Sequence, residues 1–253
     1  GLNAVFSQYA FAVYPIATQA VGAEGRCVPA CAHAHDLDGL LAAIDENTRV
    51  VFLANPNNPT GRCIEPARLL EWHRRLAERG GWLVVDEAFI DCTPEHSLAA
   101  FSQLPGLIVL RSFGKFFGLA GIRLGFVLAE PSLLERLAER LGPWTISGPA
   151  RAVATAILQD SAGQQAQRER LQADGIRLAV LLSAHGLAPA GGTALFQLVV
   201  HQQAVGLHGY FARRGILVRL FAETRCLRFG LPADEAGWQR LQQALQSWQE
   251  AFA

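Results

Sequence analysis

The sequence predicts an α/β protein with a mostly parallel sheet and helices on both faces, followed by a smaller α+β domain. Three short apolar runs, at residues 50–54, 82–86 and 107–110, each end in a polar segment that favours a loop. An amphipathic stretch at residues 65–79 separates the first two runs and ends at a pair of glycines, as helices often do. Because strands and helices alternate in this way, the strands are expected to be parallel.

The N-terminal region predicts a helix followed by a strand. Residues 7–21 carry apolar side chains at helical spacing, and Gly22 ends the pattern. A strand is expected at residues 25–29, and a short helix at residues 35–45 with Asp36 as its cap.

Beyond Pro131 the pattern changes from alternation to a mixture of longer helices and short strands. We therefore predict a large domain at residues 1–149 and a small domain at residues 150–253. The elements expected in this part are helices at 132–141, at 150–183 with a break near 160–163, and at 233–251, and strands at 194–200, 215–220 and 226–230.

Composition narrows the functional class. The 253 residues contain 22 basic and 22 acidic side chains, so no excess of positive charge indicates a nucleic-acid partner. No apolar stretch approaches the roughly 20 residues that span a membrane. No signal peptide opens the chain, which predicts a cytoplasmic location. Five cysteines, an odd number, argue against a secreted disulfide scaffold.

A cluster of cysteine and histidine raises the question of a metal site. Cys27, Cys31, His33 and His35 are residue types that bind zinc. Their spacing fits no familiar zinc finger, and a strand at residues 25–29 is expected to bury Cys27 as a small apolar side chain. We therefore predict no metal.

The segment at residues 112–125 carries the strongest chemical signal. Lys115 lies among glycines and phenylalanines, and Arg123 follows eight residues later. A lysine held in apolar surroundings loses its charge more easily, and its neutral amine can attack a carbonyl to form a Schiff base. An arginine is well suited to bind a phosphate. A lysine bonded to a phosphorylated aldehyde is the chemistry of pyridoxal 5'-phosphate (PLP), which we predict as the cofactor.

Two further motifs supply partners for that cofactor. Asn58 and Asp86 follow the first two apolar runs, and the carboxyl ends of parallel strands share one edge, so both are expected near Lys115. An ionised Asp86 would keep the pyridine nitrogen protonated, which makes the ring an electron sink. Asn58 can donate to the phenolic oxygen, while Ser112 and Arg123 can hold the phosphate. Taken singly, these residues could be a turn, a cap and a surface lysine; their order favours a common site.

Together these motifs, which extend over nearly the whole chain, resemble the fold-type I PLP enzymes of the class I/II aminotransferase superfamily. The resemblance implies a large domain with the aspartate aminotransferase fold. It also implies that Lys115 forms the Schiff base, Asp86 pairs with the pyridinium, Asn58 binds the phenolic oxygen, and Ser112 with Arg123 binds the phosphate. A homodimer is the expected assembly.

The resemblance assigns substrate contacts as well. Arg228 matches the family's arginine for the substrate carboxylate or an equivalent anion, and Arg219 is a second candidate for an anionic group. Arg225 lies nearby and is a weaker candidate, and a surface role is the alternative for each arginine. Phe11 is expected to stack on the pyridine ring, with Tyr14 as the alternative; either could instead be a core aromatic.

Two subgroups of the family are suggested by different parts of the chain. Members usually have a longer N-terminal part that binds the phosphate and reaches the partner subunit, so we expect a fragment. The change of character near residues 55–61 suggests a chimera as one hypothesis. The runs at 65–73, 85–91, 93–98 and 143–151 resemble threonine-phosphate decarboxylases of cobalamin biosynthesis, and those at 9–22 and 35–38 resemble histidinol-phosphate aminotransferases.

Phe89 helps to choose between these subgroups. Aminotransferases of this group usually have a tyrosine three residues after the pyridinium aspartate, and its hydroxyl donates to the phenolic oxygen. Loss of a hydrogen bond to a charged oxygen costs about 1.5–3 kcal/mol, and we expect a raised Schiff-base pKa. The departure favours a decarboxylase that acts on a phosphorylated amino acid. A transaminase and an inactive PLP-fold module are the alternatives.

Overall fold

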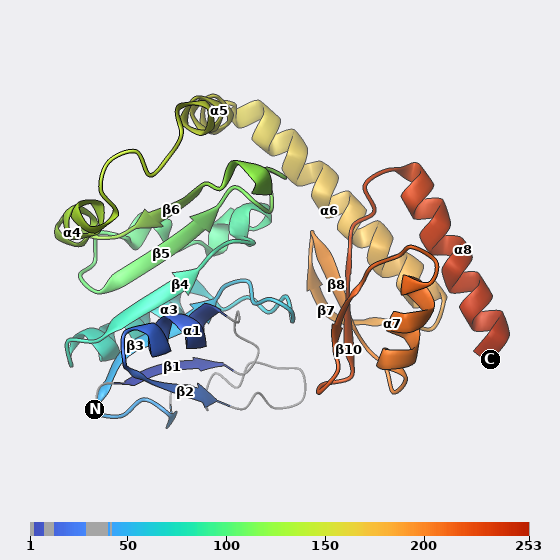
Figure 1. Ribbon diagram of the computed structural model, residues 1–253, viewed down its shortest axis with the longest axis horizontal. Coiled ribbons are helices and arrows are strands. Elements are labelled where there is room, and N and C mark those ends of the chain that lie inside the picture. The colour runs from blue at the N-terminus through green and yellow to red at the C-terminus, as the bar shows by residue number, and fades with distance from the viewer. Residues whose placement is uncertain (1–2, 8–12, 29–39, 41, 253) are drawn as a thin grey trace. The chain divides into compact units, whose positions relative to one another are not determined.

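The computed structural model describes residues 3–7, 13–28, 40 and 42–252 (Figure 1). The chain divides into two compact units, each with its own sheet. The first unit comprises Gly1–Asn58 and Arg62–Arg168, and the second comprises Pro59–Gly61 and Glu169–Ala253.

The boundary between the units falls inside a helix. Sequence analysis places it near residue 150, whereas the units divide after Arg168, within α6 (Ser161–Ala184). The reason lies in two side chains at the start of α6. The Gln167 Nε2 donates to the carbonyl oxygen of Phe116 at 3.0 Å, and the Arg168 Nε donates to that of Asp91 at 2.9 Å. These bonds tie the first turns of α6 to the first unit.

The sheet of the first unit has six strands in the order β2-β1-β3-β4-β5-β6 (Figure 1). All neighbours are parallel except β5 and β6, which are antiparallel. The predicted α/β class with a mostly parallel sheet is confirmed. The strands are β1 (Asn3–Ser7), β2 (Glu24–Val28), β3 (Thr48–Ala54), β4 (Trp82–Asp86), β5 (Leu107–Ser112) and β6 (Gly125–Leu128).

Alternation along the strands sends apolar side chains to both faces of this sheet. In β3, Val51 and Leu53 pack in the core that includes Leu69 and Trp72 of α3 (Pro66–Ala77). Phe52, between them, belongs to the core on the opposite face, which includes residues of α4 (Pro131–Leu141). Helices on both faces are therefore confirmed. The remaining helices of the unit are α1 (Val13–Ala20) and α5 (Gly148–Gln159), and the short 3₁₀ helices are Ile90–Cys92, Pro94–His96, Ala99–Phe101 and Ala120–Ile122.

The N-terminal region departs from the prediction in two ways. Strand β1 was not predicted; its place between β2 and β3 comes from long-range pairing, which the local pattern does not specify. Cys27 is exposed, contrary to expectation, because β2 is the edge strand of the sheet. Cys31, His33, His35 and Asp36 lie outside the described residues, and within the described ranges no group of three potential metal ligands occurs.

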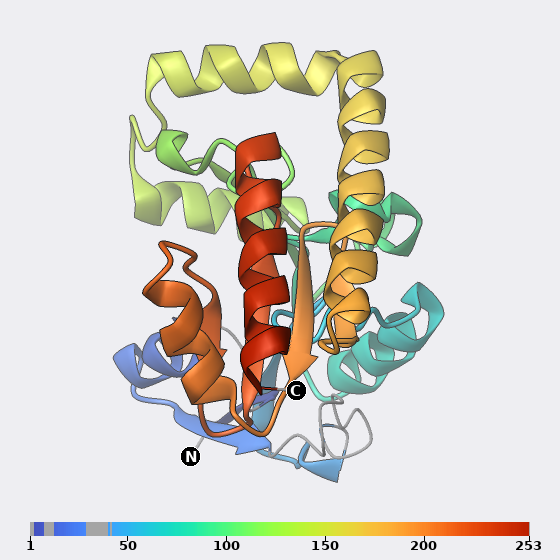
Figure 2. The same ribbon diagram turned by 90° about the vertical axis from the view of Figure 1, so that its right-hand side faces the viewer.

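The second unit has a four-stranded antiparallel sheet in the order β7-β8-β10-β9. Its helices α7 and α8 lie beside this sheet with the C-terminal part of α6 (Figure 2). The apolar side chains of these helices and of the sheet form one core. The predicted α+β character is confirmed, although β7 and α7 were not predicted. The elements are β7 (Pro189–Thr193), β8 (Phe196–Val200), α7 (Ala204–Ala212), β9 (Arg219–Phe221), β10 (Cys226–Gly230) and α8 (Glu235–Phe252).

Among the described residues, no helix combines the length and the apolar character needed to cross a membrane.

Candidate active site

A cavity of about 280 Å³ lies at the carboxyl ends of β3, β4 and β5. In this fold class ligands bind in the crevice beyond those strand ends. The structure therefore brings together side chains from three separate motifs of the sequence. The lining residues are Ala54, Asn58, Asp86, Ala88, Phe89, Leu110, Ser112 and Lys115.

Asp86 is held in place by two donors. The backbone N–H of Ala88 donates to its Oδ1 at 3.0 Å, and the Tyr14 hydroxyl donates to its Oδ2 at 2.8 Å. The Tyr14 ring stacks on Phe52, with 5.4 Å between the ring centroids. Burial raises the pKa of Tyr14, and the negative charge of Asp86 raises it further, so the hydroxyl remains a donor.

The role of Tyr14 was missed in the sequence. The residue was considered there as a ring-stacking or core aromatic, whereas its hydroxyl contacts the carboxylate 72 positions away. A signal was present, because a buried tyrosine hydroxyl usually finds a hydrogen-bond partner. The sequence did not indicate which partner. Phe11, the preferred stacking candidate, lies outside the described residues.

Lys115 reaches the cavity but is not buried. Its side chain is exposed, and its Nζ lies 5.6 Å from the centroid of the Phe89 ring. The expectation of a lysine desolvated among phenylalanines is therefore wrong for this structure. Phe113 and Phe116 are the buried residues of this segment, while the lysine lies on the opposite, open side. Phe89 is buried and presents a ring without a hydroxyl to the cavity.

The two residues predicted to hold a phosphate differ in position. Ser112 lines the cavity, and its Oγ accepts a hydrogen bond from the N–H of Gly114 at 3.1 Å, which orients the hydroxyl. Arg123 is exposed and does not line the cavity. Its backbone is left-handed with φ of 54°, and its Nη1 donates to the carbonyl oxygen of Ala120 at 3.3 Å. The structure thus places Ser112, but not the Arg123 side chain, in the site.

The loop after β3 is held in one conformation by hydrogen bonds and close backbone packing. Asn55 bridges the loop to Ile64: its Nδ2 donates to the carbonyl oxygen at 3.1 Å, and its Oδ1 accepts from the N–H at 2.7 Å. Gly61 has φ of 71°, and a Cβ there would lie 2.0 Å from the carbonyl oxygen of Gly192 within the second unit. A side chain cannot fit at this position. The loop that presents Asn58 to the cavity therefore depends on both Asn55 and Gly61.

The arginines predicted to bind substrate form a pair in the second unit. Arg219 of β9 and Arg228 of β10 lie directly opposite each other in the register. Arg228 is half-buried with its Cζ 5.2 Å from the Phe196 ring centroid; burial lowers its pKa, and the charge of Arg219 lowers it further. Like charges opposite each other destabilise a sheet, and an anion would relieve that repulsion. Arg225 is placed differently, with its Nη1 donating to Gln202 at 2.5 Å.

Comparison with known proteins identifies the family of the chain. Residues 1–245 match the family described as aminotransferase class I and II. The chain belongs to this family. It is 62% identical to a threonine-phosphate decarboxylase of Pseudomonas aeruginosa over 201 residues, which are 79% of this chain and 61% of that protein. A histidinol-phosphate aminotransferase of the same organism is 46% identical over 180 residues, 70% of this chain and 48% of that one.

A solved structure of this family has the same fold as the chain. Histidinol-phosphate aminotransferase of Sinorhizobium meliloti, in complex with pyridoxal-5'-phosphate, aligns with a TM-score of 0.89 at 26% identity. The alignment covers 100% of this chain and 72% of that one. The fold is therefore that of the PLP aminotransferases, as the sequence predicts. The chain spans about three fifths of the length of the decarboxylase that it matches.

Proposed function

We propose that the chain is part of a PLP-dependent decarboxylase that converts threonine phosphate into aminopropanol phosphate and carbon dioxide, in the cobalamin pathway. One observation supports the cofactor most directly: Asp86, Asn58 and Lys115, from three separate strand ends, line a single cavity. The 62% identity to a threonine-phosphate decarboxylase supports the choice of reaction.

The cavity residues fit the cofactor chemically. When bound, PLP supplies a cationic ring that accepts the electron pair released at the substrate α-carbon. Asp86, positioned by Ala88 and Tyr14, would face the ring nitrogen, and Asn58 would donate to the phenolic oxygen. Lys115 would bind the aldehyde carbon, and Ser112 the phosphate. Arg123 remains a candidate phosphate ligand that would have to turn toward the cavity.

The substrate has two anionic groups, which accounts for two arginines. We propose that Arg228 binds one of them and Arg219 the other, because an anion relieves the repulsion between these opposed charges. In the reaction the bond from the α-carbon to the carboxylate breaks, carbon dioxide leaves, and a proton replaces it on the α-carbon. The exposed amine of Lys115 is the group of the cavity best suited to deliver that proton.

A transaminase that acts on histidinol phosphate is the second candidate. The 46% identity to a histidinol-phosphate aminotransferase and the TM-score of 0.89 to a solved one favour it. Phe89 argues against it, because it lacks the hydroxyl that we expect at this position in the aminotransferases. We further propose a homodimer in the cytoplasm, which light scattering and cell fractionation would test.

The experiment has two stages. The chain is mixed with PLP, the visible absorbance is recorded, and the complex is reduced with borohydride. We expect a yellow species and a mass increase on the peptide that contains Lys115, and neither in Lys115→Ala. Activity of that variant should fall by at least about a thousandfold.

The second stage identifies the reaction. Carbon dioxide released from threonine phosphate supports the decarboxylase, whereas glutamate formed from histidinol phosphate and 2-oxoglutarate supports the transaminase and contradicts our first choice. A PLP adduct without either product favours an inactive PLP-fold module. Absence of any adduct contradicts the proposed cofactor.

A further inference from the structure

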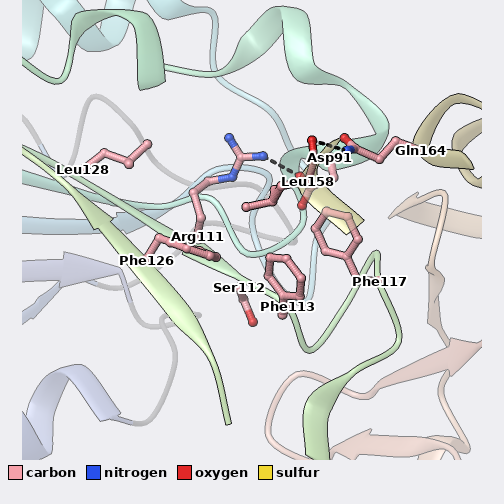
Figure 3. Close-up of a pocket in the computed structure, with 9 residues that line it drawn as sticks. All are labelled: Asp91, Arg111, Ser112, Phe113, Phe117, Phe126, Leu128, Leu158 and Gln164. Atoms are coloured by element: carbon pink, nitrogen blue, oxygen red, sulfur yellow. Dashed lines mark hydrogen bonds and ion pairs between the residues drawn. The ribbon is translucent and has the colours of Figure 1, made fainter. Parts of the chain in front are cut away.

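A second cavity of about 250 Å³ lies in the first unit (Figure 3). Ser112 lines both cavities. The second cavity is otherwise separate in composition: its walls are mainly phenylalanine and leucine, with one carboxylate among them. The lining residues are Asp91, Arg111, Ser112, Phe113, Phe117, Phe126, Leu128, Leu158 and Gln164.

Asp91 is the unusual residue of this wall. It is 7% exposed, and its Oδ1 accepts a hydrogen bond from the Nη2 of Arg111. Its Oδ2 is buried and has no hydrogen-bond partner among the described residues. A buried polar atom without a partner is costly, and such atoms are rare in folded proteins. This carboxylate oxygen therefore points to a donor that a ligand would supply.

The charges around Asp91 favour a cationic donor. Arg111 lies between two carboxylates, because its Nη1 is also 3.6 Å from the Oε2 of Glu87. Glu87 is completely buried, and Ser97 and Leu98 donate to its two oxygens at 2.6 Å each. The Arg111 guanidinium thus faces two buried carboxylates, and the charge of Arg168 also acts on Asp91; burial nevertheless raises the pKa of both acids.

The hydrogen bonds of Arg168 and Gln164 go to acceptors other than Asp91 Oδ2. The Nε of Arg168 donates to the main-chain oxygen of Asp91 at 2.9 Å, and its Nη1 donates to Gln165 at 2.5 Å. The Nε2 of Gln164 donates to the carbonyl oxygens of Ile157 and Leu158, at 2.9 and 3.2 Å. These donors of Arg168 and Gln164 are therefore already bonded to other acceptors.

Aromatic rings form much of the rest of the cavity. Phe113 and Phe117 are stacked with 4.3 Å between centroids, and Phe126 is tilted against Phe113 at 5.5 Å. Figure 3 shows the rings of Phe113 and Phe117 near Asp91. Ring faces attract cations, and apolar walls accommodate an apolar body.

We propose that this cavity binds an organic cation, whose charged nitrogen donates to Asp91 Oδ2 and whose apolar stem contacts the phenylalanines. Two sources supply this chemistry: a small free amine, and the lysine or arginine side chain of another polypeptide segment. The proposal does not depend on the decarboxylase assignment, because it concerns a different cavity and needs no PLP.

Calorimetry with benzylammonium tests the proposal, with benzyl alcohol as the uncharged analogue of similar shape. We expect benzylammonium to bind at least about tenfold more tightly than the alcohol, as a charged hydrogen bond implies. Asp91→Asn should weaken benzylammonium binding by about tenfold or more. Glu139→Gln removes one exposed acidic charge on α4, outside the cavity, and should leave the affinity unchanged.

Several outcomes decide the matter even if Asp91→Asn fails to fold. Equal binding of the amine and the alcohol by the unaltered chain would overturn the proposal, as would no binding of either, since a buried water would then suffice for Asp91. Light scattering identifies the source. Binding that leaves the oligomeric state unchanged supports a free amine, whereas benzylammonium that dissociates a self-associated chain supports a side chain of a second copy.

Discussion

Arg111 of the first unit and the pair Arg219 and Arg228 of the second unit lie in opposite electrostatic settings. In the first unit Arg111 lies between the carboxylates of Glu87 and Asp91, so its counter-charges are part of the fold. In the second unit Arg228 lies opposite Arg219, whose charge adds to burial in lowering the pKa of Arg228. A cation paired with internal acids stabilises the structure that it belongs to, whereas two opposed cations favour an external anion. The comparison distinguishes a charge that stabilises the fold from charges that we propose to bind the substrate.

The largest loss of unfolding free energy is expected from Arg111→Met. The substitution removes the cation that pairs with both buried carboxylates, and breaking a buried ion pair typically costs about 3–5 kcal/mol of unfolding free energy. Urea denaturation measures the loss. Arg75→Met is the matched control, because Arg75 pairs with Glu71 on the exposed face of α3 and should cost less than about 1 kcal/mol. Equal losses of unfolding free energy in both variants would show that the ion pairs of Arg111 stabilise the fold no more than an exposed pair does.

Tyr14→Phe tests whether Asp86 also depends on a partner supplied by the fold. The variant lacks the 2.8 Å hydrogen bond to Oδ2, and a hydrogen bond to a charged group contributes about 1.5–3 kcal/mol. We therefore expect PLP affinity to fall by about tenfold or more, measured by fluorescence titration. In Tyr210→Phe, which loses a bond to the carbonyl oxygen of Ala244, stability should fall but PLP affinity should not. A Tyr14→Phe chain with unchanged affinity would show that Asp86 needs no such support.

The pH dependence of stability provides a finer test of the charges around Arg111, which are the carboxylates of Glu87 and Asp91. Burial raises the pKa of Glu87 in the folded chain, so the folded state binds a proton more readily than the unfolded state. The unfolding free energy contributed by this group therefore falls as pH rises from its ordinary pKa through the raised one. Glu87→Gln should make that decline less steep, by at most about 1.4 kcal/mol per pH unit. Denaturation curves of both proteins at several pH values measure the difference, and identical slopes would contradict the prediction.

The smallest change in unfolding free energy is expected in the second unit, and it is a gain where Arg111→Met gives a loss. Arg219→Gln removes one of the two opposed cations and should stabilise the chain by about 0.2–1 kcal/mol. Phosphate should raise the melting temperature of the unaltered protein and have less effect on the variant. Arg225→Gln is the control, because that arginine bonds to Gln202. A destabilised Arg219→Gln chain would mean that Arg219, like Arg111, already has its counter-charge within the fold.

Much of the site was predictable from local patterns. Asn58, Asp86 and Ser112 each stand where an apolar run ends, and parallel strands place such ends on one edge of a sheet. The exposure of Lys115 was not predictable, because the segment from Ser112 to Gly125 folds back with its phenylalanines inward. The same limit applies to Tyr14, whose hydroxyl finds an acceptor far along the chain.

The amino-acid order alone established the alternating strands and helices, the two faces of the first sheet and the chemical types gathered at its edge. These follow from side-chain period and from residue chemistry, which are local properties. Folding in three dimensions determined the partners: Tyr14 for Asp86, Arg111 for Asp91 and Glu87, and Arg219 for Arg228. A hydrogen bond or an ion pair depends on distances of a few ångströms between groups, and separation along the chain does not specify those distances.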